Sequence, residues 1–138
     1  MFVHSKGIIH SDLAARQFLL DSRLDVKISD FGFSSFGDGD VLGFENSSHQ
    51  LPRDLDGDMP STIQSDVFAL GSTLYEVMTG KRPYEGTPDD AITQLYSGGT
   101  YPDVTGILCG DVIMGCWQGR FKNAEEVLEH FLALHIRI

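Results

Sequence analysis

The chain has 138 residues, of which 41% are hydrophobic and 22% are charged, and its 20 acidic against 10 basic residues give a net charge of −10. Its length and composition fit one soluble domain with a hydrophobic core and exclude a disordered, collagen-like or disulfide-dense chain. The acidic balance argues against nucleic acids and membranes as partners, and the absence of a signal-peptide pattern or a run of ~18 apolar residues predicts an intracellular, cytoplasmic protein.

Short strands and a long loop are expected in the first half of the chain. Residues 1–10 have the pattern of a helix end that runs into a turn at Gly7. The apolar runs 18–20 and 26–28, with a polar turn between them, predict two short strands or a hairpin. Residues 32–63 are rich in Gly, Asp, Ser and Pro and show little periodicity, which is typical of a functional or disordered loop.

Acidic residues gather in and around this loop. Eight of them lie from Asp30 to Asp66, with Arg53 as the one basic residue of the stretch. The stretch has two interpretations, because it is either a solvated acidic loop or a surface that favours a cationic partner.

The clearest helix signal follows the loop. Apolar residues spaced as one helical face are Val67, Leu70, Leu74, Val77 and Met78. Ser65 or Asp66 stands where an N-cap is expected, and Gly80 follows as a C-terminal stop. Phe68 and Ala69 widen the apolar surface, so we expect this helix to be central.

Three further helices are expected after a turn that begins at Pro83. They cover about residues 88–97, 104–117 and 123–135, with Asn123 as the cap of the last. The last helix carries its apolar side chains on one side and its glutamates on the other. Short strands, a long loop and then only helices predict a mainly α fold.

Two cysteines fall in the expected third helix. Cys109 and Cys116 stand seven positions apart, which corresponds to about 10.5 Å along a helix. A disulfide needs Cα atoms within about 7 Å, so a helical segment predicts two unpaired core residues. The histidines share no metal-ligand spacing with these cysteines, and we expect no metal site of that kind.

Two motifs stand close together near the N-terminus. Residues 8–20 read IIHSDLAARQFLL, and residues 29–32 read SDFG. This pair resembles the catalytic segment of a protein kinase, in which H-R-D-L-x-x-x-N precedes D-F-G with a short hairpin between them. Residues 65–71 and 74–84 are similar to the central helix of the kinase large lobe. Cys116-Trp117 is similar to a residue pair near the end of that lobe.

The resemblance covers about residues 2–130 and implies a fold. We expect a mainly α, protein-kinase-like C-terminal lobe with a short β-hairpin after the catalytic loop, as a partial kinase domain over residues 1–135. No Gly-rich loop, strand lysine or helix glutamate for the ATP phosphates precedes the catalytic segment. We therefore expect the large lobe without the small lobe.

The resemblance also implies ATP-dependent phosphoryl transfer to a protein hydroxyl, with ATP and Mg²⁺ as cofactors. Asp12 is the implied catalytic carboxylate, which accepts or orients the hydroxyl proton, and Arg16 is its catalytic companion. Asp30 and Gln17 are the implied cofactor and metal ligands. Leu19 is the implied floor of the adenine pocket, a role that is compatible with plain core packing.

The catalytic loop carries a specificity signal. Arg16 follows two alanines, as in the tyrosine-kinase version of the loop, and Ala14 stands where serine/threonine kinases usually carry a lysine. This favours tyrosine or mixed specificity towards a protein or peptide substrate, with a basic one favoured if the acidic stretch faces it.

Three departures from the kinase pattern leave two hypotheses open. Ser11 replaces the H-R-D arginine, Gln17 replaces the usual asparagine, and Arg53 stands where the A-P-E glutamate is expected. These changes favour a catalytically inactive, pseudokinase-like scaffold or interaction module. The intact Asp12 and Asp30 favour a kinase fragment that is an enzyme by family but inactive as this chain alone.

The resemblance carries three expectations about geometry. Asp12 and Asp30 are expected across one cleft, with Gln17 beside them. Arg120 is expected to pair with a loop acid, either Asp54 or Asp56. An exposed apolar patch is expected where the small lobe would lie, at Phe18, Leu19, Phe31 and Phe33.

Overall fold

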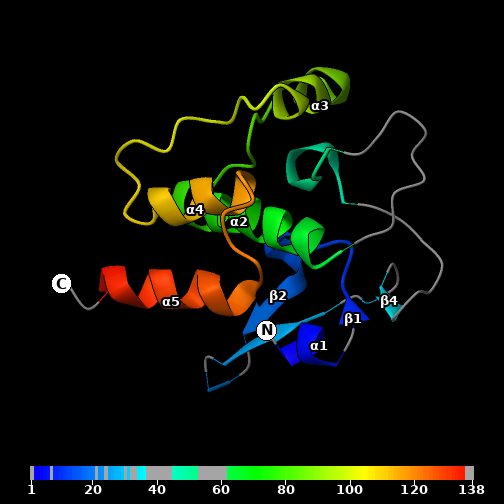
Figure 1. Ribbon diagram of the computed structural model, residues 1–138, viewed down its shortest axis with the longest axis vertical. Coiled ribbons are helices and arrows are strands. Elements are labelled where there is room, and N and C mark those ends of the chain that lie inside the picture. Colours follow the sequence, from blue (N-terminus) through cyan, green and yellow to red (C-terminus); the bar gives the residue numbers. More distant parts are fainter. Residues whose placement is uncertain are drawn as a thin grey trace.

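The computed structural model describes residues 2–6, 8–20, 22–23, 25–29, 31, 34–36, 45–52 and 62–135. In chain order its elements are α1 (Phe2–Ser5), β1 (Ile8–Ile9), the 3-10 turn η1 (Ala15–Gln17), β2 (Phe18–Leu20), β3 (Val26–Ile28), β4 (Ser35–Phe36), η2 (Ser47–His49), α2 (Ile63–Thr79), α3 (Asp89–Ser97), α4 (Gly110–Trp117) and α5 (Ala124–His135). The expected mainly α lobe with a β-hairpin is confirmed. Figure 1 shows α2 near the centre, α3 above it, α5 below it, and the strands beside α1. Among the described residues, no helix is long and apolar enough to cross a membrane.

The start of α2 is fixed by a capping box. The Thr62 hydroxyl accepts the Ser65 N–H at 3.0 Å, and the Ser65 hydroxyl accepts the Thr62 N–H at 2.8 Å. The predicted cap at Ser65 or Asp66 was therefore three or four residues late, because Ser65 is the inner partner of the box and Asp66 is fully buried. The predicted stop is confirmed, since Gly80 ends α2 with a positive φ of 77°.

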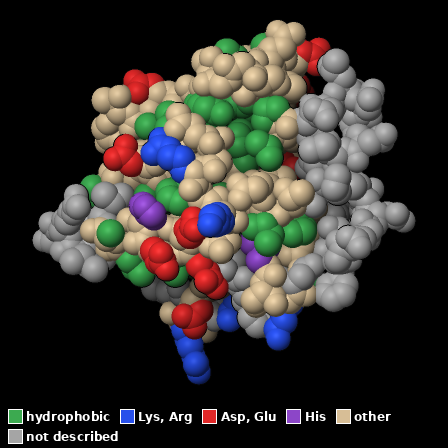
Figure 2. Space-filling view, viewed as in Figure 1, with side chains coloured by type: hydrophobic (Ala, Val, Ile, Leu, Met, Phe, Trp, Pro, Cys, Tyr) green, Lys and Arg blue, Asp and Glu red, His purple; other side chains and the backbone are tan. Residues whose placement is uncertain are grey.

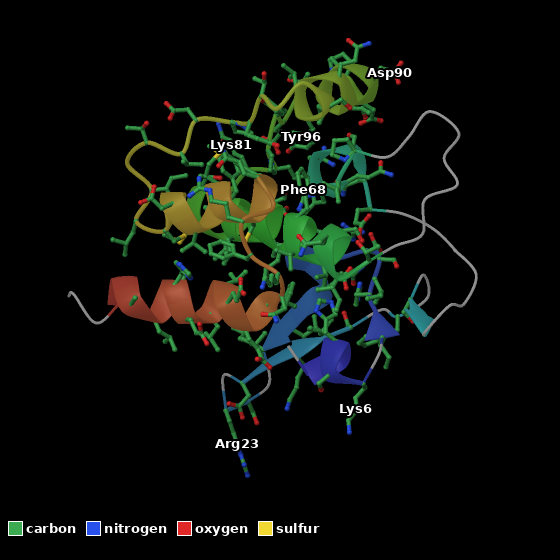
Figure 3. All side chains as sticks on the ribbon, in the orientation of Figure 1. Lys6, Arg23, Phe68, Lys81, Asp90 and Tyr96 are labelled. Carbon is green, nitrogen blue, oxygen red and sulfur yellow. The ribbon has the colours of Figure 1, made fainter. Side chains whose placement is uncertain are left out.

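Aromatic side chains form the centre of the core between α2 and α3. Phe68 of α2 meets Tyr96 of α3 edge to face, with ring centroids 5.1 Å apart (Figure 3). Both side chains are buried, and Trp117 of α4 completes the cluster with its indole N–H donating to Ser72 of α2 at 2.9 Å. Such pairs contribute roughly 0.5–1.5 kcal/mol beyond area burial, so the cluster holds three helices together.

Helices α2 and α4 approach closely because α2 carries a glycine at the crossing. A Cβ on Gly71 would lie only 2.6 Å from the Cβ of Cys116. Both Cys109 and Cys116 are unpaired and buried, as the sequence predicted. Burial raises the pKa of the Cys116 thiol to about 12 and also raises that of Cys109, so both thiols act as small apolar core groups.

The predicted third helix was wrong at its start. Residues 104–109 form successive turns, and α4 begins only at Gly110. Gly106 has a φ of 83°, a left-handed conformation that interrupts a helix, and Val104 packs directly against Gly110. The last helix agrees with its prediction, and Asn123 caps it by accepting the Glu126 N–H at 2.9 Å.

The apolar side of α5 is only partly used by the core. Val127 is buried, whereas Leu128 is 55% exposed and Phe131 and Leu132 are also exposed. Several acidic side chains stand over the same helix on the face shown in Figure 2. The core therefore covers one edge of the apolar stripe of α5 and leaves the other edge open.

Two small antiparallel sheets flank the catalytic loop. In the predicted hairpin, Phe18 pairs with Ile28 and Leu20 with Val26. A second pairing joins β1 to β4, with Ile8 opposite Phe36. The sequence did not predict this pairing, because two-residue strands are too short to show a period.

Candidate active site

Asp12 lies in the loop between β1 and η1 and is 8% exposed. Its Oδ1 accepts a hydrogen bond from Arg16 Nη2 at 2.8 Å, and its Oδ2 accepts one from Gln17 Nε2 at 3.0 Å. The structure thus brings together three of the residues that the sequence singled out. Because the Arg16 side chain is 55% exposed, water screens its charge, and its main effect is to orient the carboxylate.

Gln17 connects the catalytic loop to the segment that leads to Asp30. Its backbone carbonyl accepts the Ser29 N–H at 2.7 Å, and its side-chain Oε1 accepts a long hydrogen bond from Ser29 Oγ at 3.4 Å. The buried amide oxygen is a hard donor of the kind that Mg²⁺ prefers, and its weak bond to a hydroxyl leaves it able to take a metal. Asp30 itself lies outside the described residues, so its expected place across the cleft stays a prediction.

His10 contacts both the Asp12 loop and the segment that ends at Ser29. Its ring is fully buried, Nδ1 accepts the Asp12 N–H at 3.2 Å, and Nε2 lies 2.7 Å from the Ser29 carbonyl. Because Nδ1 accepts, Nε2 carries the proton and donates to Ser29. The ring also contacts Phe31, with centroids 4.9 Å apart. His10 is part of the sequence motif, but the sequence did not predict that its ring positions the Asp12 loop against Ser29.

Asp66 anchors the catalytic loop to α2. Its fully buried carboxylate accepts the N–H groups of His10 at 2.8 Å and Ser11 at 3.0 Å, and it faces His4 Nε2 at 2.8 Å. These bonds hold Ser11 in a left-handed conformation with φ of 71°. The interpretation of Asp66 as a possible N-cap was wrong, because its carboxylate is directed into the loop above the helix.

A second carboxylate joins η2 to the catalytic loop. Glu76 Oε1 accepts from His49 Nε2 at 2.5 Å and from the Ala15 N–H at 3.1 Å. Burial raises the pKa of the Glu76 carboxyl, but the bonds to His49 and Ala15 and the nearby charges of His49 and Arg16 outweigh it, so the pKa is lowered overall. Neither His49 nor Glu76 was singled out by the sequence, since no motif relates them.

The β2–β3 hairpin carries apolar side chains at its surface. Leu19 is 52% exposed, which excludes the alternative that it is a core residue, and Leu20 and Val26 are more exposed still. Phe31 is 40% exposed, whereas Phe18 is only partly exposed, so two of the three described members of the expected apolar patch are exposed. Phe33 lies outside the described residues.

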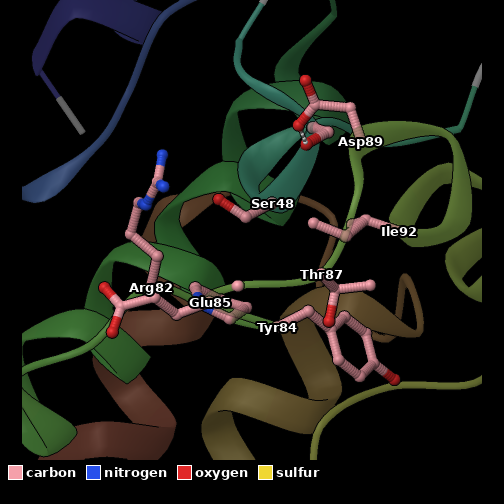
Figure 4. A pocket seen from close by; sticks show the side chains of 10 residues that line it. Ser48, Arg82, Tyr84, Glu85, Thr87, Asp89 and Ile92 are labelled. Atoms are coloured by element: carbon pink, nitrogen blue, oxygen red, sulfur yellow. Dashed lines mark hydrogen bonds between the residues drawn. The ribbon is translucent and has the colours of Figure 1, made fainter.

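A polar pocket borders η2 (Figure 4). Its volume is about 30 Å³, and it is lined by η2 and by the turn between α2 and α3. Ser47 donates to Asp89 at 2.6 Å across its edge, and Tyr84 in its wall has a positive φ of 55°. The pocket has room for about one or two waters and is far too small for a nucleotide.

Arg120 is exposed, and both its Nε and its Nη2 donate to Gln118 Oε1, at 2.9 and 2.6 Å. The two acids expected to pair with it, Asp54 and Asp56, lie outside the described residues. Arg53 lies there as well, so the pairing stays a prediction.

A comparison with known protein families shows to which family this lobe belongs. The family model described as protein tyrosine and serine/threonine kinase matches residues 1–127. The chain belongs to the protein kinase family. The matched residues include the segment around Asp12 and the D-F-G sequence that begins at Asp30, which resemble the catalytic segment of that family.

Known kinases of both specificities resemble the chain. The receptor tyrosine-protein kinase erbB-4 of Homo sapiens is 32% identical over 126 residues, which are 85% of this chain and 10% of that protein. The serine/threonine-protein kinase kin-29 of Caenorhabditis elegans is 34% identical over 97 residues, 68% of this chain and 11% of its own length. A probable serine/threonine-protein kinase of Dictyostelium discoideum is 32% identical over 121 residues, 84% of this chain and 9% of its own length. The kinase lobe described here thus spans about a tenth of each relative.

Proposed function

We propose that this lobe carries the catalytic loop of a protein kinase, which transfers the γ-phosphoryl group of ATP to a hydroxyl of a protein substrate. The observation that supports this most is the state of Asp12. It is nearly buried, both of its oxygens are oriented by Arg16 and Gln17, and its loop is anchored on Asp66. A carboxylate held in this way is suited to orient a hydroxyl and accept its proton.

Phosphoryl transfer depends on positioning and on neutralising charge rather than on covalent chemistry by the protein. In the proposed reaction the substrate hydroxyl donates to Asp12. Its proton passes to the carboxylate as the hydroxyl oxygen bonds to the γ-phosphorus of ATP, while the bond from that phosphorus to the β–γ bridging oxygen breaks and ADP leaves. Arg16 keeps the carboxylate turned towards the hydroxyl and adds positive charge beside the transferred group. Gln17 holds the second oxygen and links the loop to the D-F-G segment.

ATP and Mg²⁺ are the proposed cofactors. Gln17 and Asp30 would hold the metal through hard oxygen donors, and the metal would neutralise phosphate charge. The weakly bonded Oε1 of Gln17 supports this assignment. The exposed apolar side chain of Leu19 supports adenine binding on the hairpin.

The proposed substrate is a protein or peptide, and the proposed site of action is the cytoplasm, where ATP is available. Ala14 and Arg16 favour tyrosine or mixed specificity, as in the resemblance of the loop to tyrosine kinases. The acidic stretch from Asp30 to Asp66 favours a substrate with basic residues.

A scaffold function is the second candidate, because Ser11 and Gln17 depart from the kinase pattern at the loop itself. Ser11 has a buried hydroxyl with no hydrogen-bond partner among the described residues, in a position where most kinases carry a charged side chain. On this alternative the lobe keeps the kinase architecture for protein binding and transfers no phosphate.

The test compares the 138-residue chain with a fusion in which the small lobe of a tyrosine kinase precedes it. Transfer of labelled phosphate from ATP·Mg²⁺ to a mixed peptide substrate is measured for both. We expect no transfer by the chain alone, because phosphate contacts of roughly 1.5–3 kcal/mol each are missing. We expect the fusion to be active and Asp12→Asn to lower its rate about 10²- to 10⁴-fold.

Asp90→Asn serves as the matched control, since Asp90 is an exposed acid on α3. It is expected to leave the rate of the fusion unchanged. A folded fusion that binds the peptide but transfers no phosphate would support the scaffold function instead. Equal transfer with Asp12→Asn would contradict the role of Asp12 as the catalytic carboxylate.

A further inference from the structure

The ring of His49 meets hydrogen-bond acceptors on both sides. The side chain is fully buried, and its Nε2 lies 2.5 Å from Glu76 Oε1. On the opposite side, Nδ1 lies 2.9 Å from Asn46 Oδ1 and 2.9 Å from Ser48 Oγ. The Ser48 hydroxyl donates its one proton to Asn46 Oδ1 at 2.8 Å, so its oxygen presents a lone pair to the ring. Acceptors at both ring nitrogens are satisfied only by an imidazolium, which carries a proton on each nitrogen.

Asn46 is available for this contact because its side chain does not cap η2. An asparagine at a helix start ordinarily accepts a backbone N–H of the first turn through its Oδ1. Asn46 stands at that position of η2, but its side chain makes no capping bond to the described backbone of η2. Its Oδ1 faces the His49 ring and accepts from Ser48 instead. The start of η2 is therefore held by the ring, and through the ring by Glu76 of α2.

The charges around the ring balance when His49 carries a positive charge. Burial raises the pKa of the Glu76 carboxyl, but its hydrogen bonds and the nearby positive charges lower the pKa overall, so Glu76 is an anion at neutral pH. The other cation at this place, Arg16, is paired with Asp12 at 2.8 Å. The proton on the ring therefore supplies the positive charge that Glu76 needs in a partly buried position.

Other ionisable groups surround η2. Tyr96 of α3 donates to a carbonyl of η2 at 2.8 Å, and burial raises the pKa of its hydroxyl far above neutral. Asp89 of α3 accepts from Ser47, and Glu45 is buried on the segment that leads into η2. The pocket beside η2 adds Arg82, Tyr84 and Glu85 (Figure 4). Carboxyl, phenol and guanidinium groups ordinarily titrate outside the range of about pH 5–8, so His49 is the one described group of this set whose type titrates within it.

A second anchor of η2 does not depend on the ring. The Ser48 carbonyl accepts from the Ser72 hydroxyl and from the Tyr96 hydroxyl, both at 2.8 Å. The Trp117 indole N–H in turn donates to Ser72 at 2.9 Å. Hydroxyl donors keep their protons at neutral pH, so the middle of η2 stays on α2 and α3. Only the start of η2, at Asn46, depends on the proton of the ring.

We infer that His49 is a proton-dependent clamp on the start of η2. With two ring protons, it bridges Glu76 and Asn46 and holds the start of η2 against α2. With one proton, which Glu76 retains on Nε2, the bare Nδ1 faces two oxygen lone pairs and the start of η2 is released. The clamp is closed at mildly acidic pH and opens as the pH rises through the range in which histidine loses a proton. The inference rests on this cluster alone and stands whether or not the lobe transfers phosphate.

The ring protons are observed by NMR of the 138-residue chain with ¹⁵N-labelled histidine. Ring nitrogen shifts are recorded from about pH 5 to 9, and His49→Gln identifies the signals of His49 among the five histidines. We expect protons on both ring nitrogens at about pH 6 and on Nε2 alone at about pH 8.5. A proton on Nε2 alone over the whole range would overturn the inference, because it would show the Asn46 amide turned with its nitrogen towards Nδ1.

Backbone hydrogen exchange observes the release of η2. The His49 N–H donates to the Asn46 carbonyl at 2.9 Å, so its protection factor reports on the start of η2. We expect this protection factor to fall about tenfold as the ring loses its proton. The Ile107 N–H, which donates to Val104 at 3.0 Å in another turn, is the control and should keep its protection. Fluorescence of Trp117, the one tryptophan, should stay constant; an equal fall at both amides would show general loosening and contradict the clamp.

A substitution at Asn46 tests the clamp without removing the ring. Asn46→Asp places a carboxylate at Nδ1, so we expect the loss of the ring proton and the fall in protection to move about one pH unit higher. Asn123→Asp is the matched control, because Asn123 is also a half-buried asparagine at a helix start, and both midpoints should stay in place. Midpoints that Asn46→Asp does not move would contradict the clamp. A pH response that Glu45→Gln abolishes would assign it to Glu45 and overturn the inference.

Discussion

His49 Nε2 and Glu76 Oε1 form a partly buried contact of 2.5 Å that joins η2 to α2, and the same Glu76 oxygen accepts the backbone N–H of Ala15 in the catalytic loop. The histidine is fully buried, and its other ring nitrogen lies 2.9 Å from Asn46 Oδ1. One carboxylate thus holds two segments that are far apart in the sequence. Removing it loosens both segments at once.

The first prediction concerns the pH dependence of this contact. The pKa of Glu76 is lowered in the folded chain, so its contribution to stability is present above the ordinary value of 4.5 and is lost as the pH falls through the lower, folded pKa. We expect Glu76→Gln to reduce the free energy of unfolding by about 1–2 kcal/mol near neutral pH. The difference from the unsubstituted chain should shrink below pH 4.5, as measured by urea unfolding at a series of pH values. Glu85→Gln, at an exposed position, is the control; a Glu76 effect that is constant with pH would refute the charge-based explanation.

The second prediction concerns the anchor of the catalytic loop. Asp66→Ala leaves the buried N–H groups of His10 and Ser11 without their acceptor. Breaking a buried charged network in this way costs about 3–5 kcal/mol. We expect the free energy of unfolding, measured in urea, to fall by about that amount. Asp66→Asn keeps one acceptor and should lose less. Glu129→Ala, on the exposed face of α5, should change stability little, and a loss for Asp66→Ala as small as that would contradict the anchoring role.

The third prediction concerns the crossing of α2 and α4. Gly71→Ala places a methyl group 2.6 Å from the Cβ of Cys116, and the two helices must separate. Overpacking of this kind destabilises by roughly 1–3 kcal/mol. Cys116→Gly removes the opposing Cβ, so a double-mutant cycle between the two positions should show a coupling that restores part of the loss. Gly98→Ala, where a Cβ meets nothing closer than 3.5 Å, is the control, and a zero coupling energy would argue against the close crossing.

The fourth prediction concerns the strained residue of the catalytic loop. Ser11 adopts a positive φ of 71°, which costs a non-glycine residue roughly 1–2 kcal/mol. Ser11→Gly removes this strain and the unpaired buried hydroxyl, against a loss of about 0.4–1 kcal/mol from the greater freedom of the unfolded chain. We expect Ser11→Gly to raise the free energy of unfolding, measured by heat or urea, by about 0.5–1 kcal/mol. Ser97→Gly, in the last turn of α3, should instead destabilise, and a destabilising Ser11→Gly would show that the loop conformation is not strained.

Local patterns in the sequence were sufficient for several features of the fold and the site. The hairpin of β2 and β3, the extent of α2 up to Gly80 and the cap at Asn123 each depend on neighbours within one or two turns. Asp12, Arg16 and Gln17 meet for the same reason, since four or five residues separate them. Their proximity follows from short-range geometry, which the order of residues encodes directly.

Contacts between distant segments were decided only by the tertiary structure. The role of Asp66 depends on a loop 55 and 56 residues away, and the bond between His49 and Glu76 spans 27 residues. The apolar periodicity predicted Asp66 as a helix cap because the pattern describes only the helix that contains a residue. The pattern does not predict which distant segment packs over that helix. A buried carboxylate takes its function from whichever donors the packed chain brings to it, and these donors are set by the folding of the whole lobe.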